Sequence, residues 1–205
     1  MNKYIKFILL AVIIVAGFVG IKLVYDNLSK DYKPENGLVV EDTSTETTET
    51  NATTDTEAAK EEDADEVAKA IDFTVQDKDG NSVALYSKIG KPIVINFWAS
   101  WCSPCKAELP DFQLAYEEYG QEVEFMMVNL TDGRSETVEG ASGFINAQGY
   151  TFPVYFDVNQ EGAMAYYVAS IPTTYFIDAD GNIVAYAQGM LDYDTLKQGI
   201  DMITE

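Results

Sequence analysis

Alternating apolar and polar runs divide residues 67–205 into short strands and helices. Seven apolar stretches predict strands, at residues 71–75, 82–85, 93–98, 123–128, 154–156, 173–177 and 183–187. The first two flank Asp79-Gly80-Asn81 and the last two flank Asp180-Gly181-Asn182, and both sequences are typical of tight hairpin turns. The run at 93–98 is apolar except for Asn96, which predicts a buried strand.

Helical periodicity predicts four helices, at residues 106–119, 135–147, 160–167 and 192–203. Gly120 and Gly149 follow the first two and suit helix ends, and Asp192 or Asp194 can cap the last helix. Strands alternate with helices, and the chain ends in a hairpin and a helix. This order predicts one α/β domain over 67–205, with a mixed central sheet flanked by helices.

The first 25 residues have a different pattern. Lys3 and Lys6 precede an uncharged apolar run from Phe7 to Ile21, and Lys22 can snorkel, which extends the usable span to about 20 residues. No small-residue cleavage site follows cleanly, so we expect an uncleaved signal anchor, a single transmembrane helix with its N-terminus inside, over a cleaved signal peptide.

Residues 26–66 then predict a flexible linker. From residue 41 to 66 there are eleven acidic residues, one Lys and eight Thr, with hardly any large apolar side chains. Such a segment cannot bury enough surface to offset its chain entropy. We expect it to hold the folded domain off the membrane with a reach of roughly 35 Å.

Composition excludes several kinds of function. With 34 acidic and 13 basic residues, the net charge of −21 argues against nucleic acid as a partner. The chain has no histidine, which excludes Cys/His zinc sites and Ser-His-Asp catalysis, and two cysteines cannot form a four-thiolate zinc site. We therefore expect no metal and no cofactor beyond a redox-active disulfide.

The two cysteines form the motif Trp101-Cys102-Ser103-Pro104-Cys105, between the predicted strand 93–98 and the predicted helix 106–119. At a helix N-terminus, unpaired amide groups and the helix dipole favour a thiolate at Cys102. We predict Cys102 as the attacking thiolate and Cys105 as the resolving thiol. A structural disulfide or half of a metal site is the alternative, but a four-residue loop constrains the unfolded chain little.

A second motif, Ile171-Pro172-Thr173-Thr174, opens the predicted strand at 173–177. A cis Ile171-Pro172 bond would expose the backbone of residue 171 to an extended substrate segment that adds as a strand beside Cys102. A trans proline at a strand start is the alternative. The predicted substrate-binding residues are Trp101, Ser103, Pro104, Ile171 and Thr173.

These motifs resemble those of the thioredoxin superfamily, and within it the membrane-tethered TlpA/ResA group. The resemblance rests on Asn96 to Pro110, on Phe152-Pro153-Val154, on Ile171 to Asp178 and on Gly181, and it spans residues 71–201. It implies a thioredoxin-like fold with an N-terminal β-hairpin extension. It also implies that Pro172 is the cis proline, that Cys102 is the nucleophile and that Pro110 kinks the helix after it.

Two further positions bear on the mechanism. Thioredoxin has a buried Asp in the strand before the motif, where this chain has Asn96, which cannot titrate. Glu108 lies three residues after Cys105 on the same helical face, and the TlpA/ResA pattern has a carboxylate there too. We predict Glu108 as the proton acceptor or pKa tuner of the cysteines; the alternative is an ordinary acid favoured by the helix dipole.

The remaining aromatic residues near the motifs receive simpler predictions. Of Trp98 and Trp101, we expect one to shape the substrate surface and the other to belong to the core. We expect Tyr166 and Tyr167 to pack inside the domain.

The favoured function is an extracytoplasmic, membrane-anchored and monomeric reductase of disulfides in exported proteins. The resemblance implies apocytochrome c as a substrate class and a membrane electron donor of the CcdA/DsbD type; a sulfoxide reductase that repairs exported proteins is an equal candidate. The alternatives are a thiol oxidase, a thioredoxin-like peroxidase and a tethered, non-catalytic binding module. The oxidase lacks support because no large helical insertion precedes Ile171, and the upstream peroxidase pattern is absent before Cys102.

Overall fold

The computed structural model of the chain describes residues 39–40 and 68–205. The predicted anchor and the rest of the predicted linker lie outside the described residues. Within the described ranges, no helix is long and apolar enough to cross a membrane.

Eight strands form one mixed sheet in the order β1-β8-β7-β4-β5-β6-β2-β3. Their bounds are β1 Val39–Val40, β2 Thr74–Gln76, β3 Ser82–Ala84, β4 Ile93–Trp98, β5 Glu124–Asn129, β6 Val154–Phe156, β7 Thr173–Ile177 and β8 Ile183–Gln188. The central strand β4 runs parallel to β5 and antiparallel to β7. The mixed sheet predicted from the order of the elements is confirmed.

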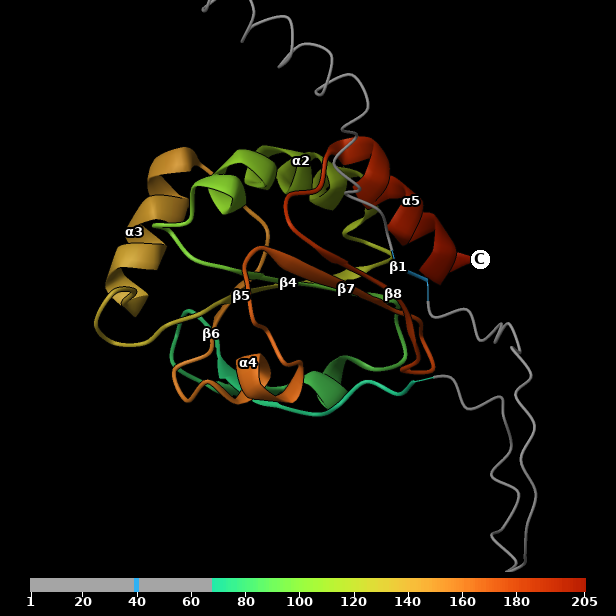
Figure 1. Cartoon of the computed structure of the whole chain (residues 1–205), viewed down its shortest axis with the longest axis horizontal. Helices are drawn as coiled ribbons and strands as arrows, with labels where there is room; N and C mark the ends of the chain where they lie inside the picture. Colours follow the sequence, from blue (N-terminus) through green and yellow to red (C-terminus); the bar gives the residue numbers. More distant parts are fainter. Residues whose placement is uncertain (1–38, 41–67) are drawn as a thin grey trace, which may run out of the picture. The chain divides into compact units, whose positions relative to one another are not determined.

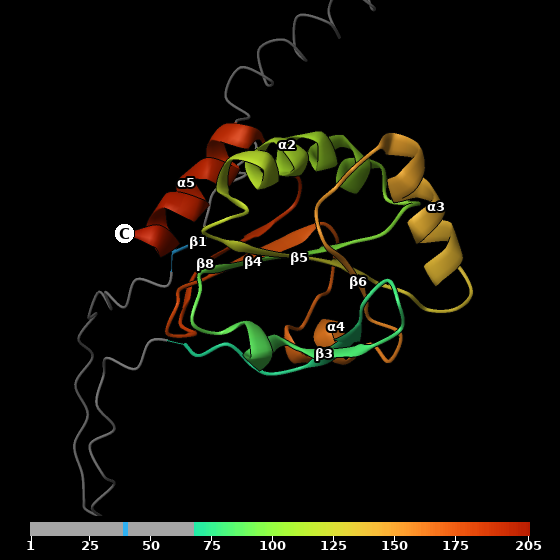
Figure 2. The same ribbon diagram turned by 180° about the vertical axis from the view of Figure 1, so that it is seen from behind.

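The helices cover both faces of this sheet. They are the 3₁₀ helix η1 Leu85–Lys88, and the α-helices α2 Ser103–Tyr119, α3 Val138–Gln148, α4 Glu161–Ala165 and α5 Tyr193–Thr204. Figures 1 and 2 show α2, α3 and α5 on one face and α4 on the other. The domain therefore has the three-layer arrangement expected of a thioredoxin-like fold.

Both predicted hairpin turns form, and the same contact explains each of them. The Asp77 carboxylate accepts the backbone N–H groups of Asp79 and Asn81. The Asp178 carboxylate does the same for Asp180 and Asn182. In each turn the Asp side chain accepts hydrogen bonds from backbone N–H groups that would otherwise be unpaired. The local sequence therefore specifies the turn.

The helix boundaries differ from the predictions where side chains cap the helices. Helix α2 begins at Ser103, earlier than predicted, because Cys102 is its N-cap. Helix α3 begins at Val138, later than predicted, because Thr137 caps it by accepting the N–H of Gly140. Helix α4 is shorter than predicted and ends at Ala165.

Strand β1 was not predicted, since Val39 and Val40 lie in the segment expected to be a linker. Val39 pairs with Tyr186 and Val40 with Ala185, antiparallel to β8. The two valines thus add an edge strand to the sheet, and such a short strand leaves no helical or alternating pattern in the surrounding sequence.

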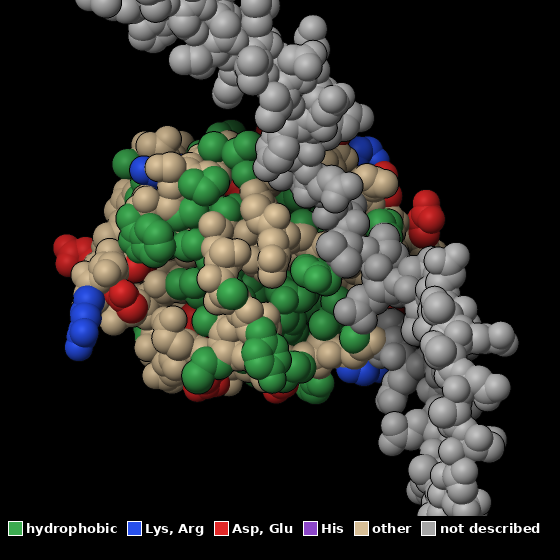
Figure 3. Space-filling model, in the orientation of Figure 1, with side chains coloured by type: hydrophobic (Ala, Val, Ile, Leu, Met, Phe, Trp, Pro, Cys, Tyr) green, Lys and Arg blue, Asp and Glu red, His purple; other side chains and the backbone are tan. Residues whose placement is uncertain are grey.

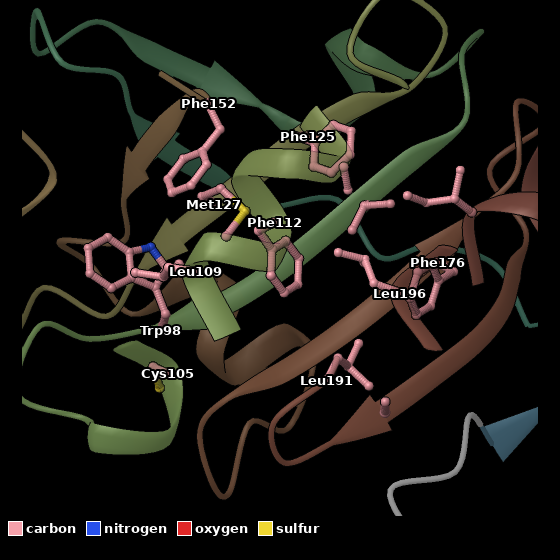
Figure 4. Packing of buried hydrophobic residues seen from close by; sticks show 14 of the residues in the cluster. Trp98, Cys105, Leu109, Phe112, Phe125, Met127, Phe152, Phe176, Leu191 and Leu196 are labelled. Carbon is pink, nitrogen blue, oxygen red and sulfur yellow. The ribbon is translucent and has the colours of Figure 1, made fainter. Parts of the chain in front are cut away.

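The side chains of β4 enter two separate clusters because successive residues of a strand point to opposite faces. Val94 and Trp98 belong to the cluster beneath α2 and α5, whereas Ile93, Ile95 and Phe97 belong to the cluster on the other face. Figure 4 shows the first cluster, with Leu109 and Phe112 of α2, Phe176 of β7 and Leu196 of α5 facing one another. Both faces are covered, so every residue of β4 is buried, which explains its continuous apolar run.

Helix α5 can approach the sheet because residue 199 is glycine. A Cβ atom there would lie 2.3 Å from Cε1 of Phe176. We expect Gly199→Ala to lower the free energy of unfolding by about 2 kcal/mol, because the overlap outweighs the better helix propensity of Ala. Gly143 in α3 is the matched control, since nothing lies within 4 Å of its Cβ position. Gly143→Ala should leave stability unchanged or raise it by up to ~1 kcal/mol, and urea unfolding of both variants would measure the difference.

Candidate active site

The two cysteines form a disulfide where β4 ends and α2 begins. The Cys102 sulfur accepts the N–H of Cys105 at 3.2 Å, so the sulfur itself caps the helix. Cys105 is fully buried, whereas Cys102 keeps a small exposed area. When the pair is reduced, the cap hydrogen bond and the positive end of the helix dipole would favour a thiolate at Cys102.

The Ile171-Pro172 peptide bond is cis, as predicted. It brings the Ile171 carbonyl oxygen to 3.7 Å from the Cys102 sulfur, although 69 positions separate the residues. The Pro172 carbonyl accepts the N–H of Gly189 at 2.8 Å, which fixes this turn against the loop after β8. A half-buried backbone segment therefore lies beside the sulfur.

The other predicted substrate-binding residues divide between the surface and the interior. Trp101 has 57% of its area exposed, and Ser103 and Pro104 are exposed beside it. Thr173 is buried, and its hydroxyl group donates to the Ser170 carbonyl at 2.8 Å, so it supports the cis-proline loop from within. Trp98 belongs to the core, which leaves Trp101 as the tryptophan on the surface.

Glu108 is completely buried beneath the motif. Its Oε1 accepts from Asn96 Nδ2 at 2.8 Å, and its Oε2 accepts from the N–H of Leu191 at 3.0 Å. Burial raises the pKa of Glu108 to about 8, against the lowering effect of these two hydrogen bonds. A carboxyl group that titrates near neutral pH can exchange a proton during thiol chemistry.

A second buried carboxylate, Glu136, was not singled out from the sequence. Its Oε2 accepts from the N–H of Ser100 at 3.0 Å and from the Ser100 hydroxyl at 2.9 Å, and its Oε1 accepts from Asn129 Nδ2 at 3.3 Å. Glu136 thus holds the short loop between β4 and Cys102. In the sequence it lies in a polar stretch and looks like a solvated acid, so only the folded chain reveals its contact.

No group of three or more acidic or cysteine side chains in the described part of the chain is placed to hold a metal ion.

The sequence of this chain is similar to those of known thiol–disulfide oxidoreductases. A sequence model of the AhpC/TSA family matches residues 67–186. The thiol-disulfide oxidoreductase ResA of Oceanobacillus iheyensis is 42% identical over 123 residues, which cover 60% of this chain and 62% of that protein. ResA of Bacillus subtilis is 30% identical over 146 residues, covering 71% of this chain and 79% of that protein. The chain belongs to the ResA-like thiol–disulfide oxidoreductases of the AhpC/TSA family.

A solved structure supports the same fold. A putative thiol:disulfide interchange protein DsbE from Chlorobium tepidum superposes with a TM-score of 0.61 and 29% identity. The match covers 69% of this chain and 99% of that one. The domain that carries the Cys102–Cys105 disulfide therefore has a thioredoxin-like fold.

The buried carboxyl of this ResA-like site should make stability depend on pH. The pKa of Glu108 is about 8 in the folded protein, above the ordinary value of 4.5. Between pH 4.5 and pH 8, Glu108 is deprotonated in the unfolded chain but keeps its proton in the folded protein. The folded state therefore loses stability as the pH rises through this range. We expect Glu108→Gln to gain about 3 kcal/mol of stability relative to the wild type between pH 5 and pH 8, because weakened hydrogen bonds lower the stability of the variant equally at both pH values. Urea unfolding of the oxidised proteins would measure this; equal pH dependence in both would contradict it.

Proposed function

We propose that this protein reduces disulfides of exported proteins on the extracytoplasmic side of the membrane. The observation that carries the proposal is the Cys102 sulfur, which caps α2 and lies 3.7 Å from the Ile171 carbonyl of the cis-proline loop. The reactive Cys102 sulfur and the Ile171 backbone lie side by side. This arrangement suits a substrate that binds as an extended strand and reacts at a disulfide.

The reaction conserves atoms and electrons in two exchanges. In the reduced protein, the Cys102 thiolate attacks one sulfur of the substrate disulfide, forms a mixed disulfide and releases the first substrate thiolate. The Cys105 thiolate then attacks the Cys102 sulfur, which forms the Cys102–Cys105 disulfide and releases the second substrate thiolate. Two electrons pass to the substrate, and a dithiol carrier in the membrane, of the CcdA/DsbD type, restores the reduced pair by the reverse exchange.

Glu108 has a proposed role in the second exchange. Cys105 is buried and must lose its proton before it can attack, and Asn96 cannot take that proton. Glu108 lies one helical turn after Cys105, with a pKa of about 8. We assign it as the proton acceptor for Cys105, and Pro172 as the residue that keeps the substrate strand beside Cys102.

The proposed location follows from the first 66 residues. An apolar segment at 1–25 would anchor the chain as a single transmembrane helix, and residues 26–38, which precede strand β1, would separate the domain from the membrane. The substrates proposed are apocytochrome c cysteines or an oxidative-repair reductase, and the protein acts as a monomer. The names of the ResA relatives support the chemistry, and the substrate class is our inference from the resemblance.

A trapping experiment tests the mechanism. With Cys105→Ser the first exchange can occur but the second cannot, so substrates should remain bound to Cys102 as mixed disulfides. We expect complexes that disappear on reduction, identified by mass spectrometry. The matched variant Cys102→Ser, which keeps only the buried Cys105, should capture none. Equal capture by both variants would sink the assigned order of the two cysteines.

The reduction potential tests the direction of electron flow. A value well below about −200 mV is expected for a reductase, and a value near −120 mV would indicate an oxidase. Equilibration of the pair with glutathione or dithiothreitol buffers, followed by alkylation of free thiols, would measure it. A potential near the upper value would overturn the proposed direction while leaving the exchange chemistry intact.

A further inference from the structure

Tyr167, just after α4, has an unusual conformation for an aromatic residue. Its φ angle is +48°, in the left-handed region that side chains with a Cβ atom rarely adopt. Its side chain is 85% exposed, so the prediction that Tyr166 and Tyr167 both pack inside the domain is wrong for Tyr167. The exposed ring of Tyr167 adds no buried surface to the core, and its backbone conformation is strained. Together these features point to a role on the surface of the protein.

The neighbouring residues hold this conformation in place. Tyr166 is buried, with its ring 4.8 Å from that of Tyr175 in an edge-to-face contact. The Tyr175 hydroxyl donates to the Tyr166 carbonyl at 2.9 Å, and the N–H of Val168 donates to the Ala163 carbonyl at 2.9 Å. The backbone is therefore fixed on both sides of Tyr167, and its ring is presented to solvent.

Tyr167 belongs to the segment that leads from α4 into the cis-proline loop beside the reacting sulfur. It precedes Ile171 by four residues, a separation of at most about 14 Å along an extended chain, and the Ile171 carbonyl is 3.7 Å from the Cys102 sulfur. Met164, 65% exposed, lies in α4 three residues before Tyr167, and Trp101, 57% exposed, precedes the disulfide. Large apolar side chains thus stand on both segments that flank the sulfur.

Charged residues are few around the disulfide, in a chain of net charge −21: the exposed Lys106 follows Cys105, and the buried Glu136 contacts Ser100. No charged residue occurs in three segments of the sequence. They are the motif segment 93–105, the cis-proline segment 162–177, and residues 183–191, which include β8 and end at Leu191. Figure 3 shows hydrophobic side chains gathered on the face that carries α4, with charged side chains mainly at its margins. This surface favours an uncharged, apolar partner segment.

We propose that Tyr167 is a specificity-determining residue that contacts an apolar side chain of the substrate near the reacting cysteine. The proposal rests on the proposed function. A substrate strand paired with the Ile171 backbone rises about 3.3 Å per residue, so the contacted side chain lies within about four residues of the substrate cysteine. The tyrosine ring supplies a rigid apolar face for that side chain.

The test compares two uncharged twelve-residue peptides that carry one cysteine as a mixed disulfide with 2-mercaptoethanol. One peptide has Leu and the other Ser at the positions three and four residues from the cysteine on both sides. Stopped-flow fluorescence follows their reaction with the reduced full-length protein in mild detergent. We expect the wild type to prefer the Leu peptide in kcat/KM by about fivefold.

Variants at Tyr167 should change this preference in a defined order. Tyr167→Phe should keep it, because the ring remains. Tyr167→Asn and Tyr167→Gly suit a positive φ angle and should keep the folded state, with unchanged or higher unfolding temperature, yet reduce the preference below twofold. Leu114→Asn removes an exposed apolar side chain from the middle of α2 and is the matched control, expected to keep the full preference.

The possible results distinguish failure of the role proposed for Tyr167 from failure of the proposed oxidoreductase function. A wild type without the Leu preference, or Tyr167→Asn and Tyr167→Gly variants that retain it, would overturn the role of Tyr167. The oxidoreductase function would still stand if the wild type reduces bis(2-hydroxyethyl) disulfide. Failure of the wild type to reduce either this compound or the peptides would instead refute the proposed function.

Discussion

The hydrogen bonds of the buried Glu108 carboxyl join the parts of the fold on which the active site depends. Asn96 donates from the central strand, the Leu191 N–H donates from the loop before α5, and Glu108 itself belongs to α2. A buried carboxyl is costly unless such donors satisfy it. The strand, the helix and the loop must therefore keep their relative positions, and the disulfide lies where these three meet.

The same contacts explain why an asparagine suits position 96. Its Nδ2 donates both to Glu108 and to the Thr174 hydroxyl oxygen at 3.0 Å, so it links β4 to α2 and to β7. An aspartate there could not donate to the carboxyl group and would place two acids against each other in the core. One titratable carboxyl thus remains beneath the disulfide, and its burial sets its pKa near neutrality.

A second set of contacts organises the surface around the sulfur. Glu136 holds the loop before Cys102 through Ser100, and the Gly189 N–H holds the cis-proline turn through the Pro172 carbonyl. Both loops are thereby fixed by the interior, which leaves their outer sides free for a partner. An acidic chain whose cis-proline segment carries no charged residue would repel other acidic molecules and favour neutral segments, so its charge pattern would contribute to selectivity.

The sequence by itself determined the local features of this protein. The turns at residues 77–81 and 178–182, the buried strand β4 and the cysteine pair at the start of α2 follow from short-range rules of capping, periodicity and turn chemistry, whereas the cis form of Ile171-Pro172 was implied by the family resemblance. Nearby residues decide these features, so a single sequence is enough to predict them.

Only the tertiary structure decided how distant groups combine. Glu136 meets Ser100 across 36 positions, Thr173 turns inward while Trp101 faces solvent, and Tyr166 is buried whereas its neighbour Tyr167 is exposed. The pKa of Glu108 depends on its burial by several elements that pack together. Burial and long-range hydrogen bonds arise from packing between elements, and no local pattern encodes which side of a loop the fold will cover.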